Sequence, residues 1–247
     1  MPSIASTSTL LSSKDKILKV FNNMISPSDR EGLLDKYQIL PNVEGLILPE
    51  ILVVNNDGLL IGYIMEKFQN SMNLNDYYSQ SIHLNFTELC NVLLDVINIL
   101  KKVHDEGIIL QDLSFDNILI NSEHDVKICD LDACEYNGHY MPFISVLYKN
   151  FISDYRGDNI HLGNPNVDKI SLMLSFIYII YMRELQYISL RDYKRLSRHI
   201  ECLDEIRKIL MRKDLHEIDL PYLDGLIREI VSMPDITIDR ELLKVSK

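Results

Sequence analysis

The sequence of residues 107–134 is GIILQDLSFDNILINSEHDVKICDLDAC, and this stretch decides the expected fold. Two short apolar runs, 118–120 and 126–129, flank a polar turn, a pattern that predicts a β-hairpin. Asn117 lies just before the hairpin and Asp130 just after it, so the two side chains are expected at the same end. Amide and carboxylate oxygens are hard ligands that suit Mg²⁺, which often takes its remaining ligands from a phosphate.

The composition of the whole chain limits the classes of function. The chain has 247 residues and a formal net charge of −11, so it lacks the strong basic excess that nucleic-acid binding favours. The four cysteines form no C-x-x-C pair, which favours free thiols in a reducing cytoplasm. No secretory signal is expected, and the longest apolar run, residues 170–182, is too short to span a membrane comfortably.

The motifs around this hairpin resemble the catalytic core of the protein kinases. D-L-S-F-D-N at 112–117 stands where that family has its catalytic loop, and D-L-D at 130–132 stands where it has D-F-G. The resemblance implies that Asp112 accepts the proton of a substrate hydroxyl. It also implies that Asn117 and Asp130 hold the magnesium ions that bridge the phosphates of ATP.

The N-terminal part offers matches to two further kinase features. The alternating run KILKVF at 16–21 predicts a strand, and Lys19 stands where the family has its phosphate-pairing lysine. A helix is predicted over residues 28–40, in which Glu31 has the spacing of the glutamate that pairs with that lysine. We therefore expect a Lys19–Glu31 ion pair.

Two apolar strands, 46–54 and 59–68, are joined by an Asn-Asn-Asp-Gly turn and lead into a polar segment. By resemblance, Met65 lines the adenine pocket, and Glu66 and Phe68 present backbone groups to the adenine edge. Leu119 is expected to form the floor of that pocket. The change of composition at residue 69 predicts a small β-rich lobe over residues 1–68 and a helical lobe over 69–247.

The remaining helices follow from apolar spacing. Residues 86–106 form the strongest amphipathic pattern, ended by Gly107. A second apolar helix opens near Asp168, which by resemblance braces the backbone of the catalytic loop. Amphipathic segments at 190–211 and 221–233 complete the expected helical lobe, and His104 is expected on the surface or in the core.

Several departures from the kinase pattern carry information. No glycine precedes Gly32, so residues 3–12, at the position of the nucleotide flap, lack the glycine-rich motif. Gln111 replaces the arginine that would bind a phosphorylated loop, and Ser114 replaces a basic residue. Asp132 replaces the glycine of D-F-G and could be a further metal ligand or a solvated turn residue.

These features predict an α+β, two-lobed protein-kinase-like fold with a reduced N-terminal β lobe and a mainly helical C-terminal lobe. The resemblance implies an ATP- and Mg²⁺-dependent phosphotransferase acting on a Ser/Thr hydroxyl of a protein substrate. Two alternatives stay open: a kinase of small molecules of the aminoglycoside or choline type, and a nucleotide-binding pseudokinase that serves as an interaction module. The substrate and the oligomeric state are not encoded in any motif.

Overall fold

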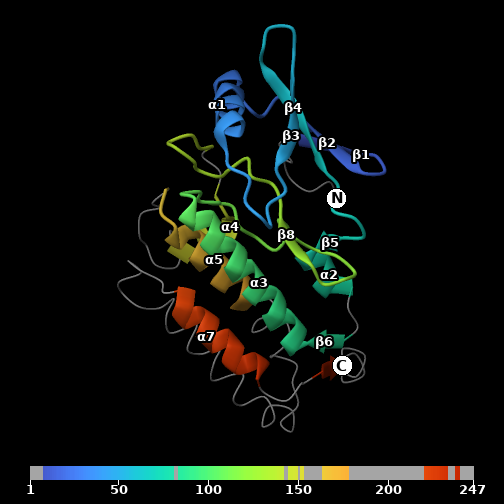
Figure 1. Ribbon diagram of the computed structural model, residues 1–247, viewed down its shortest axis with the longest axis vertical. Helices are drawn as coiled ribbons and strands as arrows, with labels where there is room; N and C mark the ends of the chain where they lie inside the picture. The colour runs from blue at the N-terminus through green and yellow to red at the C-terminus, as the bar shows by residue number, and fades with distance from the viewer. Residues whose placement is uncertain are drawn as a thin grey trace.

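The computed structural model describes residues 8–80, 83–141, 144–149, 151–152, 163–177, 220–232 and 237–239. A four-stranded sheet with helix α1 lies at one end of the molecule, and the longer helices lie at the other end (Figure 1). The short sheet that contains β5 and β8 lies between them. This arrangement agrees with the expected two-lobed α+β architecture.

The first sheet contains β1 (Ser8–Ser12), β2 (Lys16–Phe21), β4 (Leu60–Glu66) and β3 (Pro49–Val54) in that spatial order. All of its neighbouring strands are antiparallel, and Lys19 on β2 lies opposite Tyr63 on β4. Helix α1 (Pro27–Ile39) begins at Ser26, whose hydroxyl accepts a hydrogen bond from the Asp29 N–H, a normal helix N-cap. Leu33 of α1 packs into the apolar cluster of this sheet.

The second sheet carries the hairpin that the sequence predicted. Strand β7 (Ile118–Ile120) pairs with β8 (Val126–Ile128) on one side and with β5 (Met72–Asn73) on the other. Helix α2 (Leu74–Gln80) follows β5 directly. A separate pair joins β6 (His83–Asn85) to β9 (Thr237–Asp239), so a segment near the C-terminus returns to the start of α3.

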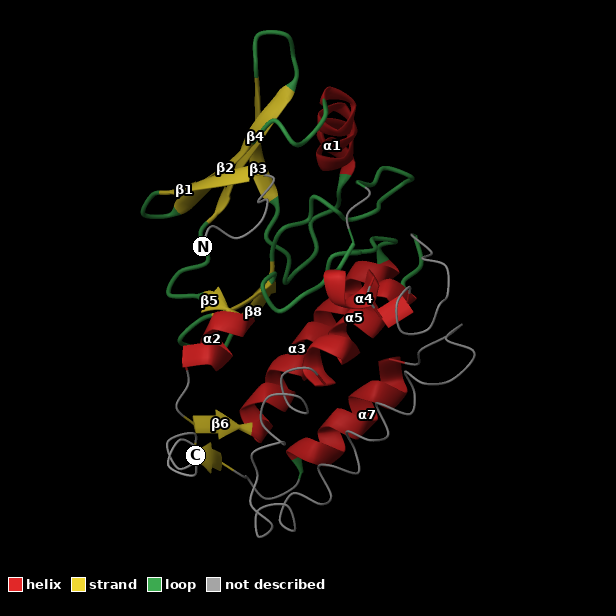
Figure 2. Cartoon of the chain, turned by 180° about the vertical axis from the view of Figure 1, so that it is seen from behind, coloured by secondary structure: helices red, strands yellow, loops and turns green. Residues whose placement is uncertain are grey.

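Helix α3 (Phe86–Asp105) packs lengthwise against α7 (Leu220–Val231), while α4 (Val146–Lys149) packs against α5 (Asn166–Ile177), as Figure 2 shows from behind. Gly107 ends α3 in the left-handed region, at φ +76°. Its N–H bonds to the His104 carbonyl and the Ile108 N–H bonds to the Val103 carbonyl. The chain then turns back beneath the helix into the loop that contains Asp112.

Most predicted elements match the described ones within a few residues. The predicted segment 190–211 lies outside the described residues, as do residues 3–7 of the expected flap. The first strand of the sheet, the five-residue β1, lies within the expected flap region. Among the described helices, none combines the length and apolar character that crossing a membrane requires.

Candidate active site

A cavity of about 830 Å³ lies between the four-stranded sheet and the β5–β7–β8 sheet. Residues 8–10 of β1 contribute to its wall, in the region expected for the nucleotide flap. The structure brings most of the predicted site residues to this cavity: Lys19, Met65, Glu66, Phe68, Asn117, Leu119 and Asp130. Asp112 lies in the loop beside Asn117, and Glu31 does not line the cavity.

The hairpin explains why Asn117 and Asp130 meet. The Cys129 N–H donates a hydrogen bond of 2.9 Å to the Asn117 carbonyl, which closes the base of the hairpin just before Asp130. Asn117 Nδ2 also donates to the Asp112 carbonyl at 2.8 Å, so its Oδ1 is the side-chain atom available to a ligand. Asp130 is exposed and has a φ of +60°. Such left-handed backbone in a non-glycine residue often occurs at functional sites.

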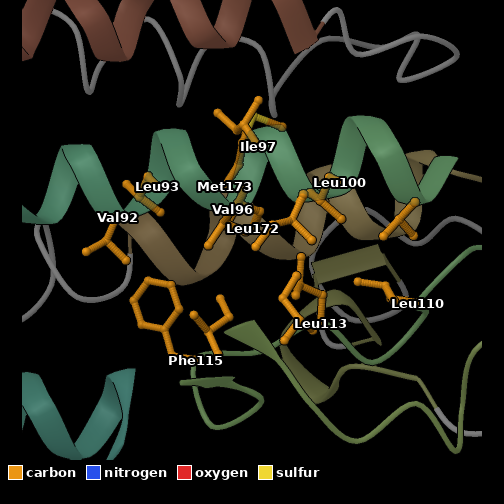
Figure 3. Close-up of a cluster of buried hydrophobic side chains, with 14 of the residues drawn as sticks. Val92, Leu93, Val96, Ile97, Leu100, Leu110, Leu113, Phe115, Leu172 and Met173 are labelled. Carbon is orange, nitrogen blue, oxygen red and sulfur yellow. The ribbon is translucent and has the colours of Figure 1, made fainter. Parts of the chain in front are cut away.

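Apolar side chains anchor the loop of residues 110–117 in the helical core. Leu110, Leu113 and Phe115 are buried and point toward α3 and α5, as the close-up in Figure 3 shows. Asp112 and Ser114, which alternate with these anchors, are only partly buried. The core therefore fixes the position of the loop that contains them.

A buried carboxylate on α5 holds the same loop by its backbone. Asp168 accepts hydrogen bonds from the N–H groups of Leu110 and Gln111, both at 2.8 Å, and it has no solvent exposure. Its predicted bracing contact to the loop backbone is therefore present. His104 Nε2 lies 2.9 Å from Asp168 Oδ2. The sequence interpretation missed this role of His104, because a contact between α3 and α5 has no signal in local spacing.

The charge state of Asp112 follows from its surroundings. Burial first, and then the nearby carboxylates of Asp130 and Asp116, raise the pKa of Asp112 to about 6, while Lys19 acts in the opposite direction. A carboxylate with a pKa near 6 is largely ionised at neutral pH and can still take up a proton. This is the behaviour expected of a general base.

Lys19 is almost fully buried and has two carboxylate partners. Its Nζ lies 2.7 Å from Asp130 Oδ1 and 2.8 Å from Asp132 Oδ2. Burial lowers the pKa of Lys19, but the charges of Asp132 and Asp130 more than offset burial and leave that pKa above its ordinary value. Lys19 is thus a fixed cation at the wall of the cavity.

The Lys19–Glu31 ion pair predicted from spacing is not formed between these two described residues. Glu31 is exposed on α1, and the residues of that helix that turn toward the site are Lys36 and Tyr37. Spacing along the sequence placed Glu31 on the helix but did not fix which face of the helix meets the sheet. The interpretation of Asp132 as a solvated turn residue is also wrong, because Asp132 is only 4% exposed.

Gln111 has a structural role at the position where a kinase arginine was expected. It is fully buried with φ +62°, and its Nε2 donates to the Ala133 carbonyl at 3.2 Å. The backbones of Ile109 and Glu135 exchange two further hydrogen bonds nearby. Gln111 therefore helps to join the loop of residues 110–117 to the segment that follows Asp130.

Residues 39–153 match the family model of the protein kinase domain. This match supports a place for the chain in the protein-kinase-like superfamily. The matched region contains Asp112, Asn117 and Asp130, which the fold brings to one site, whereas Lys19 precedes it. This protein-kinase-like chain has the α+β fold that the motifs predicted.

One curated relative adds a weaker likeness. Over 68 residues the chain is 31% identical to the "Probable serine/threonine-protein kinase PknB" of Lactococcus lactis subsp. lactis. The similar region covers 28% of this chain and 11% of that protein, so the likeness extends over a small part of the relative's length. It supports the family and leaves activity and substrate to be inferred from the site.

Proposed function

We propose that this chain catalyses ATP- and Mg²⁺-dependent phosphoryl transfer to the Ser/Thr hydroxyl of a protein. The observation that carries the proposal is the joint presence of Lys19, Asn117 and Asp130 in one cavity, beside a loop that presents Asp112. A cation, an amide oxygen and two carboxylates are the groups that phosphoryl transfer needs, because its catalysis relies on positioning and charge stabilisation.

The cavity lining combines apolar and polar side chains. Ile17, Met65, Phe68 and Leu119 supply apolar surface, which suits the flat faces of an adenine ring. Lys19, Asn117 and Asp130 supply a cation and oxygen ligands, which suit phosphates and their metal ion.

Each polar residue has a distinct role in the proposed reaction. Lys19 binds phosphate oxygens and offsets their charge. Asn117 Oδ1 and the Asp130 carboxylate are hard oxygen ligands suited to Mg²⁺, which when bound neutralises charge on the phosphates. Asp112 orients the substrate hydroxyl and accepts its proton while the hydroxyl oxygen bonds to the γ-phosphorus and the bond from that phosphorus to the oxygen of the departing ADP breaks.

The choice of a protein substrate rests on the likeness to a relative described as a Ser/Thr-protein kinase. A second candidate is a small cationic substrate. The exposed carboxylates of Asp76 and Asp116 also line the cavity and would attract an amine. An aminoglycoside or choline-type substrate would exploit this negative charge.

Transfer of labelled γ-phosphate tests both candidates. The chain is incubated with labelled ATP and Mg²⁺, and with either a protein mixture or a panel of amines and amino alcohols. We expect label on protein serine or threonine, and loss of transfer but not of ATP binding in Asp112→Asn. Asp57→Asn, an exposed residue in the β3–β4 turn, is the matched control and should retain transfer.

Label on a small amine alone would replace the protein substrate with the second candidate. ATP binding without transfer to any acceptor, in wild type and Asp112→Asn alike, would contradict the enzymatic proposal. It would favour a pseudokinase.

A further inference from the structure

Asp132 is the centre of a buried polar cluster that joins four parts of the fold. Its Oδ1 accepts hydrogen bonds from Tyr37 of α1 at 2.5 Å and from Tyr63 of β4 at 3.0 Å. Its Oδ2 lies 2.8 Å from Lys19 Nζ of β2. Asp132 itself belongs to the segment that directly follows Asp130, so the cluster links the sheet, α1 and the hairpin.

A second buried lysine attaches α1 to the same segment. Lys36 is 1% exposed, and its Nζ donates to the carbonyls of Leu131, Asp132 and Cys134 at 3.1, 2.7 and 2.9 Å. An ammonium group has three donor hydrogens, so these three carbonyls match its full capacity. Helix α1 is thus bound to the backbone of residues 131–134 as well as to the Asp132 carboxylate.

Aromatic rings pack beside the Lys19–Asp132 pair, and Lys19 Nζ lies 5.7 Å from the centre of the Tyr63 ring. The Tyr37 and Tyr63 rings meet edge to face at 5.3 Å, and Phe21 packs against Tyr63 at 5.8 Å. Burial raises the pKa of both tyrosines well above its ordinary value, so both phenols remain neutral donors. Asp132 is then the buried anion that balances Lys19, and the two hydroxyls satisfy its other oxygen.

We propose that Asp132 is the positioning residue of Lys19, in the role that spacing had assigned to Glu31. In this arrangement the carboxylate comes from the segment after Asp130, and α1 supplies the donors that hold that carboxylate in place. The inference rests on the proposed function, because it concerns how Lys19 is directed at the phosphates.

The arrangement separates two tasks between two neighbouring aspartates. Asp130 is 45% exposed at its side chain and faces the cavity, whereas the Asp132 side chain is 6% exposed. When Asp130 binds a metal ion, its carboxylate is shared with that ion, and a buried lysine that loses its anionic partner is strongly unfavourable. Asp132 supplies that anion from a position shielded from solvent.

The test compares Asp132→Asn with Glu31→Gln, a matched exposed carboxylate of α1. Acylation of Lys19 by an amine-reactive reagent is followed by mass spectrometry at fixed pH without nucleotide. Asp132→Asn removes the buried carboxylate that lies 2.8 Å from Lys19 Nζ, so the amine should be held less firmly and its acylation rate should increase several-fold over wild type. Glu31→Gln should leave the rate at the wild-type value.

The affinity for ATP provides the functional arm. Asp132→Asn should weaken ATP binding, and in a Lys19→Met background the same substitution should have no further effect, because Asp132 acts through Lys19. Equal ATP affinity in wild type and Asp132→Asn, or a loss in Glu31→Gln as large as in Asp132→Asn, would overturn the inference.

Asp130→Asn keeps the test decisive if Asp132→Asn does not fold, because residue 130 is exposed. With Asp132 still in place, the Lys19 amine should remain protected from acylation in Asp130→Asn. If Lys19 in Asp130→Asn is acylated as fast as an exposed lysine, the inference is overturned. The acylation assay needs neither ATP nor turnover. If wild type does not bind ATP, the proposed function is contradicted, but the comparison of Lys19 acylation between variants and wild type still tests the role of Asp132.

Discussion

At the scale of single residues, Asp112 links the local electrostatics to the proposed chemistry. Its pKa of about 6 arises first from burial and then from Asp130 and Asp116. A general base must be ionised, so kcat/KM for transfer should rise with pH and level off above about pH 6. Rate measurements across this range test the prediction, with Asp57→Asn expected to give the wild-type profile. A rate independent of pH through this interval would exclude Asp112 as the titrating base.

The same residue should reduce stability in its ionised form. The pKa is higher in the folded state than the ordinary value of 3.8, so the folded state binds the proton more tightly. Stability is therefore greatest below the unfolded pKa and falls as pH rises toward 6. Asp112→Asn should raise the free energy of unfolding at neutral pH by about 1–3 kcal/mol. Urea denaturation should show a higher free energy of unfolding for Asp112→Asn than for wild type at neutral pH and no difference in acid. An equal difference at both pH values would contradict an electrostatic cause.

The positions of site residues could be predicted from the sequence where a motif flanks a short β-hairpin. Asn117 and Asp130 could be paired because a short hairpin returns the chain to its starting point, as the Cys129–Asn117 hydrogen bond shows. Spacing alone could not predict whether Glu31 faces Lys19, because a helix of 13 residues presents several faces and only tertiary packing selects the face that meets the sheet. The contact of His104 with Asp168 joins two helices distant in sequence and equally required the structure.

At the scale of elements, the close approach of β2 and β4 sets the position of Lys19. A Cβ on Gly62 of β4 would lie 2.2 Å from the Lys19 carbonyl, a backbone atom that cannot move without moving β2. Gly62→Ala should therefore lower stability by about 1–3 kcal/mol and weaken ATP binding. Denaturation and nucleotide titration measure the two effects.

Gly32 provides the matched control for that substitution. It lies in α1, and no atom lies within 4 Å of the position that an added methyl group would take. Gly32→Ala should therefore stabilise the helix by about 0.5–1 kcal/mol. If Gly62→Ala and Gly32→Ala change the free energy of unfolding by similar amounts, the strands must accommodate the added methyl group at residue 62 without loss of stability. Such a result would remove the steric argument for the position of Lys19.

The elements themselves were predictable where a periodic pattern was long or a turn was strong. The apolar spacing of α3 and its stop at Gly107 located both ends within a residue, and the Asn-Asn-Asp-Gly turn located the β3–β4 hairpin. The strand β1 was less predictable, because its Ser/Thr-rich sequence has exposed leucines and gains order by pairing with β2. Pairing partners of that kind are not visible in a local pattern.

At the scale of the whole molecule, the described residues form two apolar clusters, one around α3 and one beneath the first sheet. Leu119 and Cys129 pack against the second cluster although they belong to the β7–β8 hairpin, so the hairpin connects the two. The cavity lies at this connection. A ligand bound there contacts both parts and should stabilise the whole chain rather than one element.

The melting temperature should therefore rise when ATP and Mg²⁺ are added together. At a ligand concentration about one hundred times Kd, the stabilisation is about 2.7 kcal/mol. For a chain of this size it corresponds to a rise of about 5–10 °C. Asp130→Asn removes a carboxylate suited to Mg²⁺ and should lose the magnesium-dependent part of the rise, while Asp57→Asn should keep it. An equal magnesium-dependent rise in Asp130→Asn would show that the metal does not use Asp130, and no rise in wild type would exclude this cavity as an ATP site.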